Sequence, residues 1–162
     1  MASYDPQIHH RRSIRLKGYD YSRPGRYYIT LTVKNRQCLF GTINGGVMEL
    51  SEYGRLIEKF WRWLKERYDH IDLGEFVIMP NHLHGIIIIN GDCRGVSRNT
   101  PTRKPLGQII GAFKTVTTKH INQIRGTQGK KLWQRDFYEN IVRNDQDYSR
   151  ICQYIKDNPK NW

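Results

Sequence analysis

The feature that most constrains the fold of this chain is a pair of apolar runs separated by two turn-forming residues. Residues 75–79 read EFVIM, and residues 82–90 read HLHGIIIIN, with four consecutive isoleucines. Pro80 and Asn81 stand between the runs, and both residue types favour turns. We therefore predict two antiparallel strands joined by a tight turn. The isoleucine run requires burial, so other elements must cover this part of the sheet.

The remaining periodicities predict three helices and two further strands around this pair. Ser51 is a suitable N-cap for the first helix, and Asn144 or Asp145 for the last. Without the last helix, the order is the split βαβ pattern. We therefore predict an α+β fold: a ferredoxin-like antiparallel sheet with helices mainly on one face, followed by a C-terminal helix. The expected elements are a strand at 26–35, a short hairpin or loop at 39–50, a helix at 51–68, the strands at 75–79 and 82–90, a helix at 106–124, a strand at 137–144 and a helix at 144–159.

The length of 162 residues suits a single domain covering residues 1–162. Residues 1–23 are rich in basic side chains and are expected to form an N-terminal arm. Residues 91–105 combine Gly, Pro, Ser and Thr with basic residues and have no periodicity, which predicts a mobile loop.

The charge indicates a polyanionic partner. The chain has 27 Lys and Arg against 15 Asp and Glu, a formal net charge of +12. Residues 98–135 contain nine basic residues and no acidic one, a pattern typical of phosphate-binding surfaces rather than of an ordinary solvated face. No run approaches the ~20 apolar residues that span a membrane. Three widely spaced cysteines and the absence of an apolar leader favour a cytoplasmic protein with reduced thiols.

His82 and His84 are the first candidates for chemistry. Residues two apart on a strand project to the same face, so the two imidazoles lie side by side. As a bare pattern, such a pair is more often two surface histidines than a metal site. Its place at the start of a strand, beside a turn, favours the metal site, because a substrate can reach it there. With oxygen ligands completing the set, Mg²⁺ or Mn²⁺ would fit better than structural zinc.

The last predicted helix offers two more polar groups on one face. Tyr154 and Asn158 are four residues apart and therefore lie one turn apart. By spacing alone, Tyr154 is an ordinary amphipathic tyrosine at the rim of the helix.

Several separated blocks of this sequence resemble the REP-associated branch of the single-tyrosine HUH transposases. MPNHLHGIIII is similar to the histidine–apolar–histidine motif of that family, and the C-terminal block ends in YIKDNP. The resemblance covers nearly the whole chain, with its blocks in the same order. These blocks are residues 23–41, 79–89, 106–122 and 133–159.

The resemblance implies a DNA strand transferase. In that family the histidine pair and a polar residue one turn beyond the tyrosine hold a divalent metal. The tyrosine attacks a phosphate of single-stranded DNA and leaves a 5′-phosphotyrosine and a free 3′-OH. Carried over, His82, His84 and Asn158 would be the metal ligands, for Mg²⁺ or Mn²⁺, and Tyr154 the nucleophile.

The resemblance also implies single-stranded or hairpin DNA as partner, and a monomer rather than a homodimer. The basic side chains expected to bind DNA are Arg11, Arg12 and Arg15 of the arm and Lys114 and Lys119 of the middle helix. Two alternatives stay open: a catalytically silent regulator that binds hairpin DNA, and a rolling-circle-type nickase.

Overall fold

The computed structural model describes residues 16–91 and 104–162, and its elements follow the predicted order. The strands are β1 (Gly25–Thr32), β2 (Gly41–Asn44), β3 (Val47–Leu50), β4 (Ile71–Met79), β5 (His82–Ile89) and β6 (Tyr138–Val142). The helices are α1 (Glu52–Arg67), α2 (Leu106–Arg125) and α3 (Asp145–Asp157), and short 3-10 turns span Lys34–Arg36 and Asn158–Asn161.

The main sheet has four strands in the order β4-β5-β1-β6, and every neighbouring pair is antiparallel. The hairpin of β2 and β3 forms a separate two-stranded sheet. This is the ferredoxin-like α+β arrangement that the sequence predicts, and the fold class is confirmed. The two central strands are β5 and β1, so the isoleucine run lies in the middle of the sheet.

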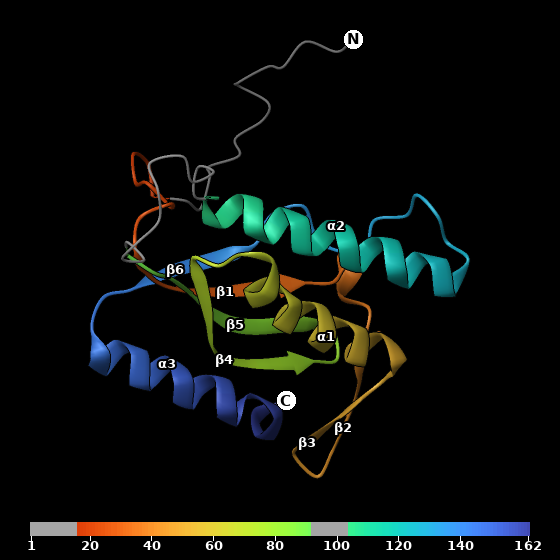
Figure 1. Cartoon of the computed structure of the whole chain (residues 1–162). Helices are drawn as coiled ribbons and strands as arrows, with labels where there is room; N and C mark the ends of the chain where they lie inside the picture. Colours follow the sequence, from red (N-terminus) through yellow and green to blue (C-terminus); the bar gives the residue numbers. More distant parts are fainter. Residues whose placement is uncertain (1–15, 92–103) are drawn as a thin grey trace, which may run out of the picture.

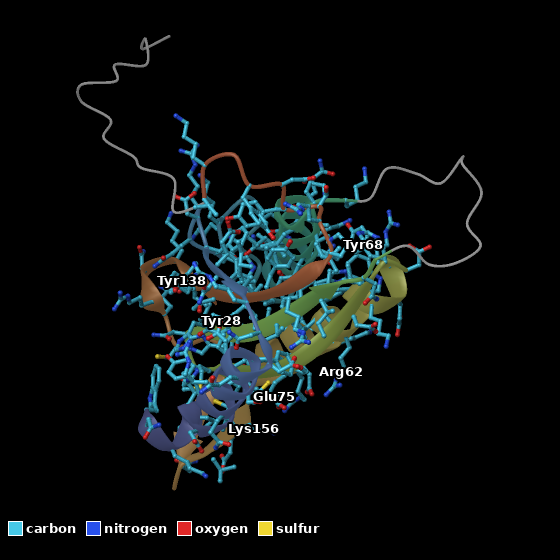
Figure 2. The ribbon with its side chains drawn as sticks, turned by 90° about the vertical axis from the view of Figure 1, so that its left-hand side faces the viewer. Tyr28, Arg62, Tyr68, Glu75, Tyr138 and Lys156 are labelled. Atoms are coloured by element: carbon cyan, nitrogen blue, oxygen red, sulfur yellow. The ribbon has the colours of Figure 1, made fainter. Side chains whose placement is uncertain are left out.

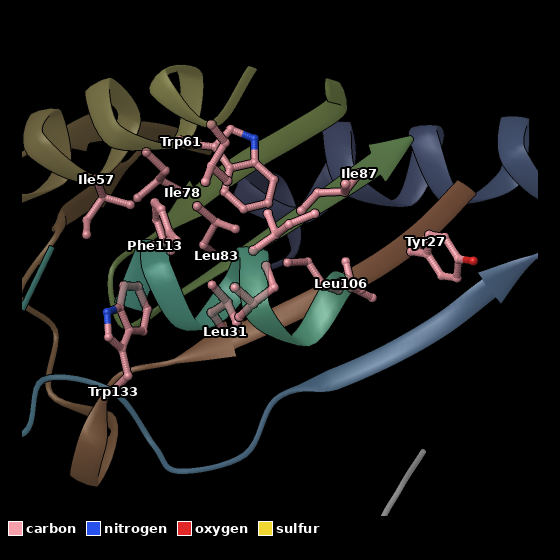
Figure 3. Packing of buried hydrophobic residues seen from close by; sticks show 14 of the residues in the cluster. Tyr27, Leu31, Ile57, Trp61, Ile78, Leu83, Ile87, Leu106, Phe113 and Trp133 are labelled. Carbon is pink, nitrogen blue, oxygen red and sulfur yellow. The ribbon is translucent and has the colours of Figure 1, made fainter. Parts of the chain in front are cut away.

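Helices cover both faces of the sheet but unequally, as Figure 1 shows: α1 and α2 lie on one side and α3 on the other. The larger core lies beneath α1 and α2, where Trp61, Leu83 and Phe113 pack together with no exposed surface (Figure 3). The smaller core lies beneath α3 and contains Ile86 and Ile155. Strand β5 alternates between the two cores, which explains why its apolar run is continuous.

Close packing at the centre of β5 depends on Gly85. A Cβ added there would lie 2.5 Å from a ring carbon of Trp61. A larger residue would therefore push the α1 indole away from the strand. The missing side chain lets Trp61 sit directly on the sheet.

The helix caps agree with the sequence, with one difference in the apolar stripe of α2. The Ser51 hydroxyl accepts a hydrogen bond from the Gly54 amide, and the Asn144 side chain accepts one from the Asp147 amide. The helical spacing includes Ile124 in the apolar stripe, but this residue in the last turn of α2 is exposed, and the buried residues of the helix end at Asn122.

Two segments singled out in the sequence lie largely outside the described residues. Of the expected arm, the part from residue 16 onward is described, and Tyr19 and Tyr21 pack against the larger core there. Residues 1–15 and 92–103 are not described. None of the helices in the described ranges combines the length and apolar character that crossing a bilayer requires.

Candidate active site

His82 and His84 lie on the face of β5 that α3 covers. They alternate with Leu83, which belongs to the larger core on the opposite face. His84 is buried, with 6% of its surface exposed, whereas His82 is half-buried at the beginning of the strand. The two Nε2 atoms are 2.9 Å apart. Both imidazole rings therefore project from the same face of β5, as the sequence predicts.

A chain of hydrogen bonds orients both imidazoles. The Asn81 side-chain amide donates to the Arg36 carbonyl, so its oxygen faces His82 Nδ1 at 2.6 Å, and Nδ1 is the protonated nitrogen. The Tyr28 hydroxyl is 2.8 Å from His84 Nδ1 and donates to it. This leaves His84 Nε2–H to donate to the lone pair of His82 Nε2.

Both rings are held in the neutral form. Burial lowers the pKa of His84 to about 3, reinforced by the nearby His82 and partly offset by a hydrogen bond with the Asn158 side chain. Burial also lowers the pKa of His82, as does the positive charge of Arg36. Neutral imidazoles are the form that binds a metal ion, because the ligating nitrogen must carry a free lone pair.

Helix α3 brings Tyr154 to the histidine pair, and its C-cap residue Asn158, the first residue of the following 3-10 turn, lies beside it. The centroid of the Tyr154 ring is 5.6 Å from that of His84, in an edge-to-face arrangement, and 54% of the side chain is exposed. The Asn158 side-chain amide donates to the Tyr154 carbonyl, which orients its oxygen toward His84. Four residues that the sequence singles out on two distant elements are thus brought together.

The donor atoms fit a divalent ion. Two ligands at ~2.1 Å from one ion and at right angles to each other stand ~3 Å apart, and the Nε2–Nε2 distance is 2.9 Å. Within residues 16–91 and 104–162, no three His, Cys, Asp or Glu side chains group together as a metal site. A third protein ligand here would therefore have to be an amide or a hydroxyl, as Asn158 offers.

Three residues near the pair have roles that sequence reasoning missed. Besides Tyr28, the Thr30 hydroxyl lies 2.9 Å from His84 Nδ1, and the ring centroid of Trp162 is 5.9 Å from that of His82. Tyr28 and Thr30 alternate with buried residues of β1, so their shared face was readable from the sequence. Their position beside His84 depends on the register of β1 and β5, in which Thr30 pairs with His84 and Tyr28 with Ile86, and this register could not be predicted from the sequence.

The predicted DNA-binding lysines lie elsewhere. Lys114 and Lys119 are on α2, on the far side of the sheet from the histidines, where they border an open hollow of about 690 Å³. The Lys114 ammonium donates to the carbonyls of Gln134, Arg135 and Asp136 at 2.9 to 3.3 Å, so it also has a structural role. Arg11, Arg12 and Arg15 lie outside the described residues.

Tyr148 is the other tyrosine of α3 near the sheet, and its surroundings differ from those of Tyr154. The guanidinium of Arg26 lies over its ring at 4.7 Å from the centroid, and burial raises the pKa of its phenol. Tyr148 thus packs with Arg26 and the smaller core, and we use it below as a matched control.

The fold and the site define a class: a ferredoxin-like α+β protein with paired histidines on a central strand, facing a tyrosine on a helix. No protein-family model matches the chain. An uncharacterized protein of Haemophilus influenzae is 38% identical over 170 aligned residues, which cover 98% of this chain and 93% of that relative. The chain belongs to the same protein family as this relative.

The resemblance seen in the sequence is confirmed as well. The REP-associated tyrosine transposase of Escherichia coli is 24% identical over 140 residues, covering 86% of this chain and 68% of the relative. A solved structure of a REP-associated tyrosine transposase bound to a REP hairpin superposes with a TM-score of 0.60 and 20% identity. It covers 91% of this chain and 73% of that one. At this identity the superposition shows a shared fold.

Proposed function

We propose that this chain is a transposase-like DNA-processing enzyme that binds hairpin DNA. It would cleave and rejoin single-stranded DNA beside such hairpins. Two similar proteins support a transposase-like role with hairpin DNA. One is a REP-associated tyrosine transposase, and the other is a structure of such a transposase bound to a REP hairpin. The net charge of +12 supports a DNA partner on independent grounds.

The proposed cleavage and rejoining of DNA rest on four side chains that lie close together. They are His82 and His84 of β5, Tyr154 of α3 and Asn158 at the C-terminal cap of α3, and they meet on one face of the sheet. Of these, the histidines are oriented as metal ligands, whereas Tyr154 has a nucleophilic hydroxyl and is more than half exposed, so a phosphate can approach it.

In the proposed reaction the Tyr154 hydroxyl oxygen forms a bond to the phosphorus of a DNA phosphodiester. The bond from phosphorus to the 3′ oxygen breaks, and the phenolic proton ends on that oxygen. The products are a 5′-phosphotyrosine and a free 3′-OH. Because the covalent bond preserves the energy of the phosphodiester, a 3′-OH can reverse the step and rejoin a strand without ATP.

We propose Mg²⁺ or Mn²⁺ as the cofactor, held by His82, His84 and Asn158. When bound, such an ion polarises a phosphate oxygen and offsets the charge that develops there. The protein supplies two neutral, oriented imidazoles and a tyrosine beside them. Since Tyr154 approaches the His84 of its own chain, a monomer is sufficient for the proposed reaction.

The test is a covalent adduct. The protein is incubated with a hairpin DNA labelled on its single-stranded flank, with Mn²⁺ or Mg²⁺, and run on a denaturing gel. A labelled band at the protein's mass is expected for wild type. Tyr154→Phe should lose it, and Tyr148→Phe should retain it because that hydroxyl stands apart from the histidines.

The outcomes separate the alternatives. An adduct that persists in Tyr154→Phe and disappears in Tyr148→Phe would move the nucleophile to Tyr148. Hairpin binding with no adduct under any metal condition would favour the silent regulator. An adduct that never transfers to a second 3′-OH would favour the nickase.

A further inference from the structure

Large exposed aromatic side chains gather at one place on this protein. In the described residues, the aromatic residues classed as exposed are Tyr138, Tyr154 and Trp162, with exposed fractions of 47, 54 and 56%. They come from β6, from α3 and from the residue after the last 3-10 turn. All three nevertheless surround the histidine pair. An exposed apolar patch of this kind marks an interaction surface.

The three rings are the exposed members of one continuous row. Tyr138 lies beside Tyr28 (Figure 2), and the row passes through Tyr154 and the two histidines to Trp162. The successive centroid distances are 6.1 Å from Tyr138 to Tyr28, 6.4 Å to Tyr154, 5.6 Å to His84, 4.5 Å to His82 and 5.9 Å to Trp162.

We propose that this row is a stacking platform for unpaired DNA bases, with Tyr138 and Trp162 each holding a base on either side of Tyr154. The inference rests on the proposed function and adds its specificity-determining residues. An aromatic face accepts any base, and stacking requires a base that is not already paired in a duplex.

Charge supports a nucleic-acid strand as the occupant rather than a protein. The Asn81 side chain donates to the Arg36 carbonyl and faces His82 Nδ1 at 2.6 Å, so the exposed Arg36 lies near the Trp162 end of the row. A strand that places bases on the rings brings its phosphates past this guanidinium. Neighbouring aromatic and cationic groups are the combination that single-stranded DNA requires.

The position of the row bears on which phosphate is cleaved. Tyr154 stands in the middle of it, with Trp162 toward one end and Tyr138 at the other. Bases held at both ends would fix the phosphate between them near the Tyr154 hydroxyl. Single-strandedness of the flank, and not only the neighbouring hairpin, would then determine where cleavage occurs.

The inference can be tested by binding alone, without metal. Affinity for a short oligothymidine is measured by fluorescence anisotropy in EDTA for wild type, Trp162→Ala and Tyr138→Ala. Each alanine variant should bind roughly 5- to 100-fold more weakly. Trp162→Phe and Tyr138→Phe, which keep a ring, should bind nearly as wild type. Ile124→Ala removes an exposed apolar side chain from α2 and should leave affinity unchanged.

An abasic oligonucleotide of the same length separates stacking from phosphate binding. It keeps the phosphates and lacks the bases, so Trp162→Ala should cost no affinity for it. Equal losses on both strands, or no loss on oligothymidine, would overturn the stacking platform. Because binding is measured without cleavage, failure of the stacking platform can be told apart from failure of the proposed reaction in the adduct experiment.

Discussion

At the scale of single residues, the Tyr28 hydroxyl can be a hydrogen-bond partner of His84 Nδ1 in either tautomer of that ring. It lies 2.8 Å from Nδ1, and the Thr30 hydroxyl lies 2.9 Å from the same atom. For Nε2 to bind a metal ion, its proton must move to Nδ1. Either hydroxyl oxygen can then accept a hydrogen bond from Nδ1–H. The two side chains thus stabilise the ligand form of His84 as well as the metal-free form.

We therefore predict that Tyr28→Phe weakens Mn²⁺ binding by about tenfold, because partners of a ligating imidazole contribute to metal affinity on that scale. Tyr28→Phe with Thr30→Val should weaken it further. Titration calorimetry measures the affinity. Tyr27→Phe is the matched control: it removes a neighbouring hydroxyl on the opposite face of β1, which donates to the Arg23 carbonyl. An equal effect of both single variants would contradict the prediction.

Stability should fall in mild acid because of His84. Burial lowers its pKa from 6.5 to about 3 in the folded protein. Between these pH values the unfolded chain binds more protons than the folded one, so the free energy of unfolding decreases as pH falls. The stability contributed by the neutral His84 is fully present above pH 6.5 and is lost toward pH 3. The slope from this residue is on the order of 1 kcal/mol per pH unit. Urea unfolding in EDTA at pH 7 and pH 5 should show a smaller loss for His84→Gln than for wild type.

At the scale of elements, β5 connects the site to the larger core. Successive residues of β5 face opposite sides of the sheet, so His84 lies on the side of α3 and Gly85 lies against Trp61 on the other side. We predict that Gly85→Ala lowers the free energy of unfolding by about 1–3 kcal/mol, because the added methyl overlaps the indole. The control is Gly111→Ala in α2, where a Cβ meets nothing within 4 Å. This variant should be as stable as wild type or more stable by up to about 1 kcal/mol. Both are measured by urea unfolding.

The connection between α2 and β6 is fixed by Lys114. We predict that Lys114→Met lowers the free energy of unfolding by about 1–3 kcal/mol, since three carbonyl oxygens lose a charged donor. Lys119→Met should change it by less than about 0.5 kcal/mol because that side chain is exposed.

The same pair of variants tests the predicted contacts to DNA. A lysine that binds a phosphate contributes about one unit to the slope of log affinity against log salt. A smaller slope in Lys119→Met, with unchanged stability, would support a DNA contact. Wild-type stability in Lys114→Met would contradict its structural role.

At the scale of the whole molecule, the arrangement of elements could be predicted because local periodicity carries it. Strands and helices were distinguishable by their spacing, and the order of the elements determined the antiparallel sheet. Placing Tyr154 beside the histidines needed the family resemblance, because spacing alone favoured an ordinary rim tyrosine. The contacts of Tyr28 and Trp162 depend on pairings between distant segments, which a single sequence does not reveal.

Helix α3 packs on a core of its own, separate from the larger one beneath α1 and α2. It is further attached by two surface ion pairs, Arg26 with Asp145 at 2.8 Å and Lys156 with Glu75 at 3.5 Å, which contribute little. We predict that α3 amides exchange with solvent deuterium faster than those of β5, because α3 can open without disrupting the larger core. Equal protection of both elements would contradict this.

Local opening of α3 would separate Tyr154 from the histidines while the rest of the chain stays folded. The fraction of molecules with Tyr154 in place for the proposed reaction is then set by the opening equilibrium of one helix, not by global stability. Ligands that contact both α3 and the sheet would shift this equilibrium toward the closed form. A DNA strand lying across the site would be such a ligand, and it would thereby favour the assembled state that the proposed cleavage requires.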